Sequence, residues 1–131
     1  MKKKSREANT EQLVQEIING LREKKGKDIV TLDLRKIDTS VTDFFVLCTG
    51  DSNTHVNALA GSVEEEVRKA IKDKPWHIEG TTNGEWVLLD YVNVVVHIFQ
   101  RETREHYNIE GLWADADMKE YDDVAPTTEK K

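Results

Sequence analysis

The residues most suggestive of chemistry lie in a short turn after an apolar segment. Gly50, Asp51 and Ser52 follow the apolar run 44–48 and precede a helical pattern. Backbone amides at a helix N-terminus can bind a phosphate group, so this turn is a candidate nucleotide site. Asp51 argues against it, because a carboxylate repels phosphate and no Lys stands beside it in the sequence. We therefore interpret Asp51 or Ser52 as the N-cap of the following helix.

A strand, turn and helix of this kind also occur in nucleotidyltransferases, which need two or three carboxylates on neighbouring strands to hold a divalent metal ion. The required Asp-x-Asp strand is missing, and the strands after the helix offer only Glu79 and Asp90. A nucleotidyltransferase-like, nucleotide-binding enzyme is therefore the alternative function from another class. Our main hypothesis is a protein with no catalytic residue, no cofactor and no metal site.

The histidines and the single cysteine do not form a pattern typical of catalysis or of metal binding. No H-x₃-H or C-x₂-C spacing occurs. Cys48 lies in mid-strand, where a buried thiol is a poor nucleophile, and it has no second cysteine with which to form a disulfide. His97 lies in the most apolar segment, and we interpret it as a hydrogen-bonded core histidine with Asp90 as its candidate partner.

Helices and strands must position these residues. Apolar residues at helical spacing predict amphipathic helices from Thr10 to before Gly26 and from about Val56 to Ile71, with Pro75 as a stop. A short helix is expected over 101–112. Strands are predicted over 28–34, 44–48, 76–79, 86–89 and 94–99. This order predicts an α/β (α+β) domain, with a mixed sheet of about five strands and flanking helices.

One domain accounts for the 131 residues. We expect it to span 10–114, between a flexible N-terminus over 1–9 and a disordered, highly charged tail over 115–131. About eighteen consecutive apolar residues, as a membrane helix needs, occur nowhere. With a single cysteine, this favours a cytoplasmic protein that does not contact membranes.

The formal net charge of −6 bears on the kind of partner. A protein that holds RNA through its phosphates normally carries a basic face, so direct nucleic-acid binding is not expected. Partners with basic surfaces are favoured instead, and added salt should weaken the attraction.

The sheet carries more apolar surface than two helices can cover. Residues 86–89 and 94–96 are apolar at every position, which predicts two apolar faces. Either the C-terminal helix completes the core through Tyr107, Leu112 and Trp113, or the second face docks another chain. A second copy and a foreign partner could use the same patch, and we expect a homodimer when the chain is free.

Several short motifs follow one another in a specific combination, from the first helix to about Trp113. They are residues 42–50 with Ser52 and His55-Val56, then 79–80, 85–91, 95–97, and Tyr107 with Leu112-Trp113. Together they closely resemble the ribosomal silencing factors of the RsfS/Iojap family. The resemblance implies a nucleotidyltransferase-like fold without the catalytic carboxylates. It also implies binding to the large ribosomal subunit through ribosomal protein fourteen (uL14), which sterically blocks subunit joining and represses translation without catalysis.

Site residues are also implied by the resemblance, carried over by position. Trp86 would be the aromatic anchor, with Leu88 and Tyr91 as apolar neighbours and Asp90 as the charge that faces a basic side chain. His97 belongs to the same motif, with a role in orienting Asp90. Core packing is the alternative role for each of these residues.

One departure from the family concerns the step after Tyr91. The family usually has Gly and then Asp there, whereas this chain has Val92 and Asn93. Valine resists a positive φ, so this hairpin is where the chain could differ from the family, and one acidic charge is absent.

Overall fold

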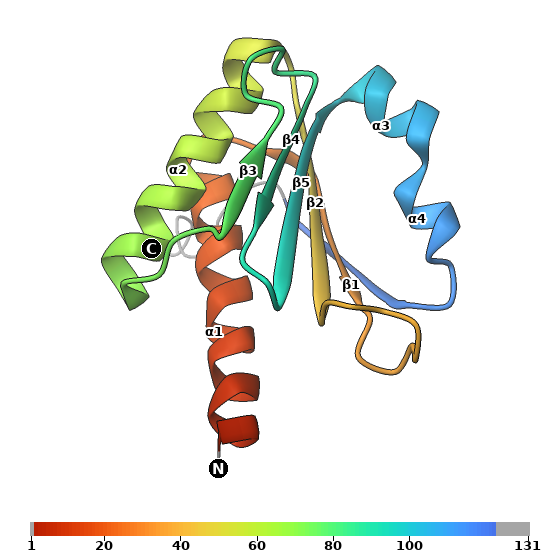
Figure 1. Cartoon of the computed structure of the whole chain (residues 1–131). Coiled ribbons are helices and arrows are strands. Elements are labelled where there is room, and N and C mark those ends of the chain that lie inside the picture. Colours follow the sequence, from red (N-terminus) through yellow and green to blue (C-terminus); the bar gives the residue numbers. More distant parts are fainter. Residues whose placement is uncertain (1, 123–131) are drawn as a thin grey trace.

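The computed structural model describes the backbone of residues 2–122 and the side chains of residues 10–122. Four helices and six strands follow one another along this part of the chain (Figure 1): α1 (Lys2–Glu23), β1 (Lys27–Asp33), β2 (Phe44–Gly50), α2 (Asn53–Ile71), β3 (His77–Glu79), β4 (Trp86–Asp90), β5 (Val94–Gln100), α3 (Arg101–Tyr107), α4 (Ile109–Leu112) and β6 (Asp117–Tyr121).

The strands form one mixed sheet in the order β3-β4-β5-β2-β1-β6. Only β2 and β5 run parallel, and helix α2 with the β3–β4 meander makes the long connection between them. The other neighbours are antiparallel. The predicted mixed α+β sheet is thus confirmed, with one strand more than expected.

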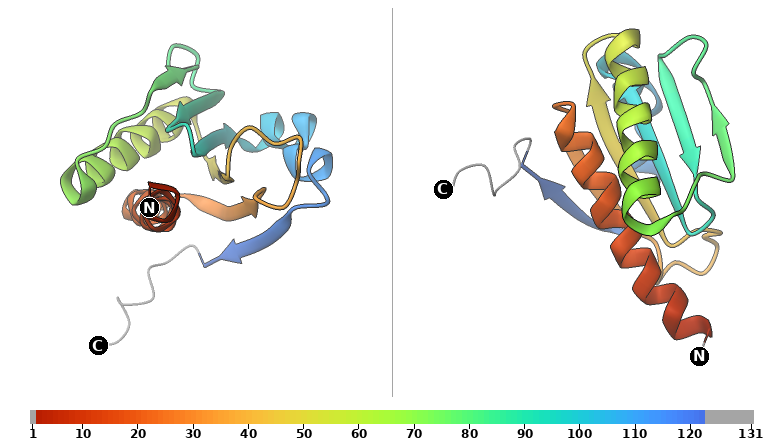
Figure 2. Two further views of the ribbon diagram at one scale, coloured as in Figure 1. Left: turned by 60° about the horizontal axis from the view of Figure 1, so that its bottom comes forward. Right: turned by 90° about the vertical axis from the view of Figure 1, so that its left-hand side faces the viewer.

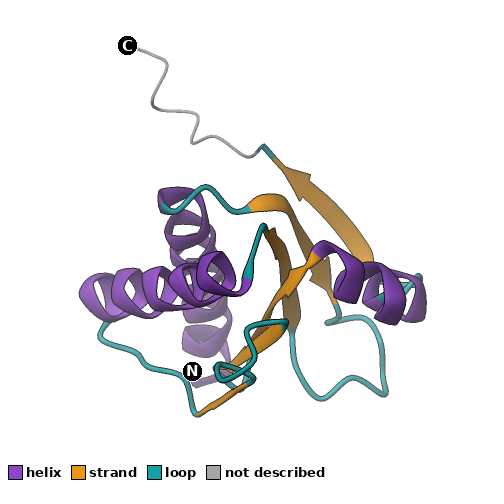
Figure 3. Ribbon diagram, turned by 90° about the horizontal axis from the view of Figure 1, so that it is seen from above, coloured by secondary structure: helices purple, strands orange, loops and turns teal. Residues whose placement is uncertain are grey.

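Helices cover the two faces of the sheet unequally. The long helices α1 and α2 pack side by side on one face, and the short helices α3 and α4 lie on the other (Figures 1 and 3). The larger core cluster lies under α1 and α2, and it includes Ile17, Val63 and Val96. The smaller cluster on the opposite face includes Leu47, Phe99 and Ile109. The second face therefore has much less helical cover.

Helices α1 and α2 approach closely at Gly20. A Cβ atom there would lie 2.8 Å from the Cα of Val63, so the contact requires glycine. The Ser62 hydroxyl donates a hydrogen bond of 2.7 Å to the Gly20 carbonyl at the same point. This crossing holds the two helices together over the sheet (Figure 2).

Both ends of the domain differ from expectation. Helix α1 begins at Lys2 instead of Thr10, so the backbone of residues 2–9, expected to be flexible, continues the helix. Part of the tail expected to be disordered forms β6, which pairs antiparallel with β1 from Ile29↔Tyr121 to Asp33↔Asp117. The tail prediction was wrong for this segment because backbone hydrogen bonds to an open sheet edge can order a strand that has little apolar surface. Residues 123–131 lie outside the described part of the chain.

The C-terminal helix predicted over 101–112 is divided in two. Asn108 has φ +47 and ends α3, and its side chain accepts a hydrogen bond from the Gly111 amide to begin α4. Asparagine tolerates this left-handed conformation better than most residues. The break lets α4 turn back over the sheet, where Ile109 is buried.

Candidate protein-docking surface

Alternation along β4 places Trp86, Leu88 and Asp90 on the face opposite α1 and α2. All three are half-buried, whereas Val87 and Leu89 between them are fully buried on the helix-covered face. In the β4–β5 register Leu88 lies opposite His97, and Asp90 lies opposite Val95. The structure therefore brings four of the five predicted site residues, Trp86, Leu88, Asp90 and His97, onto one face.

Trp86 is the centre of an aromatic cluster. Its ring centroid lies 4.7 Å from that of Tyr107 on α3 and 5.2 Å from that of Phe99 on β5. Its indole Nε1–H donates a hydrogen bond of 3.1 Å to Nδ1 of His97. A half-buried tryptophan held in this way keeps a fixed orientation, which is the property of an interface anchor.

His97 has a different partner from the one expected. Its hydrogen bond joins Trp86 and not Asp90, because His97 lies opposite Leu88 whereas Asp90 lies opposite Val95, two pairs further along the hairpin. Nδ1 accepts this bond, so the neutral ring carries its proton on Nε2, which has no hydrogen-bond partner among the described residues. Burial lowers the pKa of His97 to about 4. The ring therefore remains neutral at physiological pH.

Asp90 stabilises the turn of the β4–β5 hairpin. Its Oδ1 accepts a hydrogen bond of 2.7 Å from the amide of Val92. The Thr42 hydroxyl donates a bond of 2.9 Å to the Val92 carbonyl from the other side. Val92 has φ +80, so the chain adopts here the positive φ that valine resists. The carboxylate of Asp90 thus has a role within the fold, and its charge lies at the rim of the face.

Tyr91 is separated from the other four predicted residues. It is 5% exposed and packs in the cluster under α1 and α2. Burial, with smaller contributions from Glu64 and Asp73, raises the pKa of Tyr91 well above its usual value. Tyr91 follows Asp90 directly, and one step along extended backbone turns a side chain to the opposite face. The expectation that it neighbours Trp86 on the same face was therefore wrong.

Two further residues on this face were missed. Phe45 on β2 and Val95 on β5 are a half-buried cross-strand pair next to His97 and Asp90. Phe45 packs edge-on against His97 with ring centroids 4.7 Å apart. Val95 could have been predicted from the sequence, because it lies two residues before His97 in the same strand and therefore faces the same side of the sheet.

Helices α3 and α4 cover only part of the face. Ile109 is buried against the strands, and Trp113 packs edge-on against Phe45 at 5.7 Å. Leu112 stays exposed. The C-terminal helix thus completes the core only in part, since Ile109 of α4 packs over β1 and β2 while the outer face of β4 stays half-buried. We call Phe45, Trp86, Leu88, Asp90 and Val95, with His97 beneath them, the docking face.

The turn at 50–52 makes its contacts within the chain. The Ser52 hydroxyl accepts a hydrogen bond of 3.1 Å from the His55 amide, which confirms Ser52 as the N-cap of α2. The Asp51 amide donates to Nδ1 of His55 at 2.8 Å, and the Asp51 carboxylate forms an ion pair with Lys27 at 3.3 Å. Side chains of the chain itself thus occupy the turn, including a carboxylate that would oppose a phosphate.

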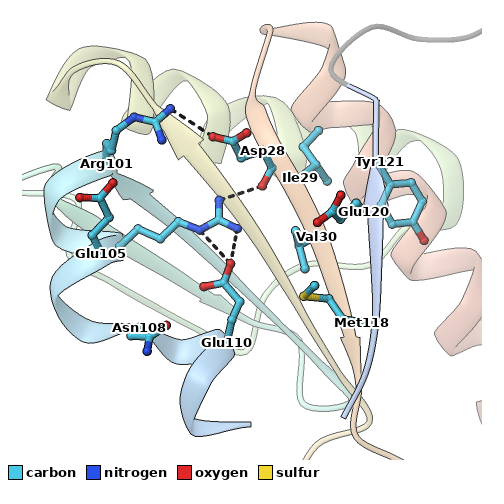
Figure 4. Close-up of a pocket in the computed structure, with 11 residues that line it drawn as sticks. Asp28, Ile29, Val30, Arg101, Glu105, Asn108, Glu110, Met118, Glu120 and Tyr121 are labelled. Carbon is cyan, nitrogen blue, oxygen red and sulfur yellow. Dashed lines mark hydrogen bonds and ion pairs between the residues drawn. The ribbon is translucent and has the colours of Figure 1, made fainter. Parts of the chain in front are cut away.

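A cavity of about 480 Å³ lies on the same side of the sheet as α3, between α3 and strands β1 and β6 (Figure 4). Arg104 on its wall is held by the chain itself, with hydrogen bonds to Glu110 at 2.6 Å, to the Asp28 carbonyl at 2.7 Å and to the Thr49 hydroxyl at 2.9 Å. Arg101 pairs with the carboxylate of Asp28 at 3.1 Å. These bonds fasten α3 and α4 to the sheet.

The part of the chain between residues 2 and 122 offers neither a metal-ligand cluster nor a membrane-spanning helix. Between residues 2 and 122 no group of three His, Cys, Asp or Glu side chains is placed to hold a metal ion. Within the same range no helix is long and apolar enough to span a membrane.

Comparison with known proteins identifies the family. A sequence model described as ribosomal silencing factor during starvation, RsfS, matches residues 7–131. The chain belongs to this family. The ribosomal silencing factor RsfS of Halalkalibacterium halodurans is 34% identical over 119 residues, which cover 88% of this chain and 97% of that protein.

Similarity extends to a solved structure and to an organellar protein. A crystal structure of a Chromobacterium violaceum protein has a TM-score of 0.75 and 41% identity, covering 79% of this chain and 85% of that one. The mouse protein named mitochondrial assembly of ribosomal large subunit protein 1 is 28% identical over 109 residues, which are 82% of this chain and 46% of the mouse protein. Relatives of this chain thus carry names that refer to silencing of the ribosome or to assembly of its large subunit.

Proposed function

We propose that this RsfS-family chain represses translation by placing its docking face on ribosomal protein fourteen (uL14) of the large subunit, where it sterically blocks the small subunit. The observation that supports this most directly is Trp86, a half-buried aromatic side chain that donates a hydrogen bond to His97 on the sheet face that α3 and α4 cover only in part. Burial of such an anchor on a partner supplies much of the affinity of a protein interface.

The electrostatics of the docking face favour a basic partner. Asp90 carries a carboxylate at the rim, and no hydrogen bond or ion pair involves its Oδ2 among the described residues. The whole chain has a formal net charge of −6. Ribosomal proteins are typically basic, so an acidic protein can dock on one of them without competing for RNA phosphates.

Names of relatives support the large subunit as the target. The mouse relative is named for assembly of that subunit, and the bacterial relative is named as a silencing factor. Steric blocking requires binding but no turnover, so the proposal includes no catalytic step. It also places the chain in the cytoplasm, where bacterial ribosomes work.

Self-association through the same face is the second part of the proposal. Free in solution, the chain would form a homodimer that hides Trp86 and Leu88, and the ribosome would compete with the second copy. Light scattering at tens of micromolar should then give the dimer mass for the wild-type chain and the monomer mass for Trp86→Ala. If the wild-type chain is monomeric at this concentration, the proposed homodimer is wrong. The proposed binding to the ribosome would not be affected.

Cosedimentation tests the proposed function. The chain is mixed with purified large subunits, purified small subunits or joined ribosomes and is centrifuged through sucrose. It should travel with free large subunits, be absent from small subunits, and be depleted from joined ribosomes. Equal recovery with joined ribosomes would show that binding does not involve the surface between the subunits.

A further inference from the structure

Val92 is a strained residue at the tip of the β4–β5 hairpin. It has φ +80, a left-handed conformation in which the two γ-methyl groups of a β-branched side chain crowd the backbone. Its side chain is 61% exposed, so burial in the core does not compensate for the strain. A glycine would adopt the same backbone conformation with little strain.

The surrounding structure imposes this conformation on Val92. The amide is held by Asp90 Oδ1 at 2.7 Å, and the carbonyl is held by the Thr42 hydroxyl at 2.9 Å. The next carbonyl, of Asn93, accepts hydrogen bonds from the amides of Asp43 at 3.0 Å and Phe44 at 3.2 Å. The turn is therefore fixed independently of the valine side chain, which contributes little to the fold.

Two other exposed apolar side chains belong to segments attached to this hairpin. Val41 is 97% exposed and precedes Thr42, which binds the Val92 carbonyl. Trp76 is 79% exposed, and its amide donates to the Asp90 carbonyl at 2.7 Å. Three separate segments thus bring exposed apolar residues to the end of the sheet at which Asp90 lies. We call Val41, Trp76 and Val92 the hairpin rim.

We propose that Val92 contacts the same basic ribosomal protein as the docking face and is a specificity-determining residue. The hairpin rim would then extend the docking face. This inference rests on the proposed function. The hairpin rim should contact the same partner as the docking face because the two surfaces adjoin: Asp90 belongs to the docking face and also fixes the Val92 turn. The fold requires the turn but not a valine in it, and a strained residue whose side chain is exposed suggests a function, because an apolar contact with a partner would balance the strain.

Two substitutions distinguish the effect of the Val92 side chain on binding from the effect of its backbone strain on stability. Val92→Gly relaxes the backbone and removes the side chain, so the melting temperature should rise by about 4 °C. Binding to purified large subunits should nevertheless weaken by about fivefold, as expected for the loss of one apolar contact at a rim. Val92→Thr keeps the shape and the strain but replaces one γ-methyl group with a hydroxyl, so it should weaken binding without raising the melting temperature.

The opposite signs of the two Val92→Gly effects are the critical result, because damage to the fold lowers stability and binding together. If Val92→Gly binds as well as the wild type while Trp86→Ala loses binding, this inference is wrong and the proposed function stands. If neither variant changes binding, this inference and the proposed function are both wrong. A Val92→Gly variant that melts below the wild type would contradict the strain on which the inference rests.

Discussion

The indole Nε1–H of Trp86 donates a hydrogen bond to Nδ1 of His97, with the two nitrogens 3.1 Å apart. The bond requires a neutral imidazole, because a protonated ring has no free lone pair. The orientation of the proposed anchor and the protonation state of a buried histidine are therefore linked. His97 acts by positioning Trp86, and its own side chain is only 5% exposed.

The first prediction follows from the lowered pKa of His97. Its pKa is about 4 in the folded chain, against 6.5 as the ordinary value, so the unfolded chain binds a proton first as the pH falls. The stability contributed by neutral His97 is present above pH 6.5 and is lost progressively toward pH 4. Urea unfolding should give a free energy of unfolding lower by about 2 kcal/mol at pH 5 than at pH 7 from this group.

The matched control for the pH effect is His97→Gln, which does not titrate and keeps an acceptor for Trp86. This variant should show a flatter dependence of stability on pH between 5 and 7 than the wild type. Identical pH slopes for the two chains would show that His97 has the same pKa in the folded and unfolded chain, which contradicts this prediction.

The second prediction concerns the charge of Asp90. Asp90→Asn keeps an oxygen for the Val92 amide, so the hairpin should stay intact while one negative charge is removed. Binding to large subunits should weaken and become less sensitive to salt, because a rim charge acts mainly through long-range attraction. The measurement is the dissociation constant at several salt concentrations.

Glu120→Gln is a suitable control for Asp90→Asn, since Glu120 is an exposed carboxylate on the distant edge strand β6. It removes the same charge and should change the salt dependence much less. Equal effects of the two variants would mean that only the net charge matters and that Asp90 faces no particular basic group.

The third prediction concerns the attachment of α3 and α4 to the sheet. Arg104→Met removes the guanidinium that binds Glu110, the Asp28 carbonyl and the Thr49 hydroxyl. The Arg104 side chain is only 11% exposed, so the free energy of unfolding should fall by about 3 kcal/mol, as for a broken buried ion pair. Urea unfolding measures the change.

Arg101→Met tests whether the Arg104 effect depends on burial. Arg101 forms an ion pair with Asp28 at 3.1 Å, but its side chain is 60% exposed. Exposed pairs contribute little, so this variant should unfold within about 0.5 kcal/mol of the wild type. Similar losses from both variants would contradict the special role given to Arg104.

Much of the fold follows from apolar periodicity, but β6 could not be predicted in this way. Its residues are exposed except for half-buried Tyr121, so the segment has the composition of a disordered tail. Backbone pairing with β1 orders it, and pairing depends on which sheet edge is open, a property of the assembled sheet.

The docking face was predicted in part. Trp86, Leu88 and Asp90 share the parity of one strand, so alternation alone brings them together. Tyr91 was misplaced because closeness in sequence was taken for closeness in space. The partner of His97 depends on the register of β4 against β5, which sequence pattern alone does not determine.

A subunit-joining assay tests most directly whether the docking face blocks the joining of the two ribosomal subunits. Purified subunits are mixed with increasing amounts of wild-type chain, Trp86→Ala or Met118→Ala, and joining is followed by light scattering. Met118 is an exposed apolar residue on β6, far from Trp86 in the strand order, and serves as the matched control. Each variant is first shown to be folded by circular dichroism and thermal melting.

The expected result is that the wild type and Met118→Ala prevent joining at the same concentration. Trp86→Ala should require at least about 30-fold more protein, which corresponds to the 2 kcal/mol typical of a hot-spot aromatic. If a stably folded Trp86→Ala chain blocks joining at the wild-type concentration, the docking face is not the surface that silences the ribosome.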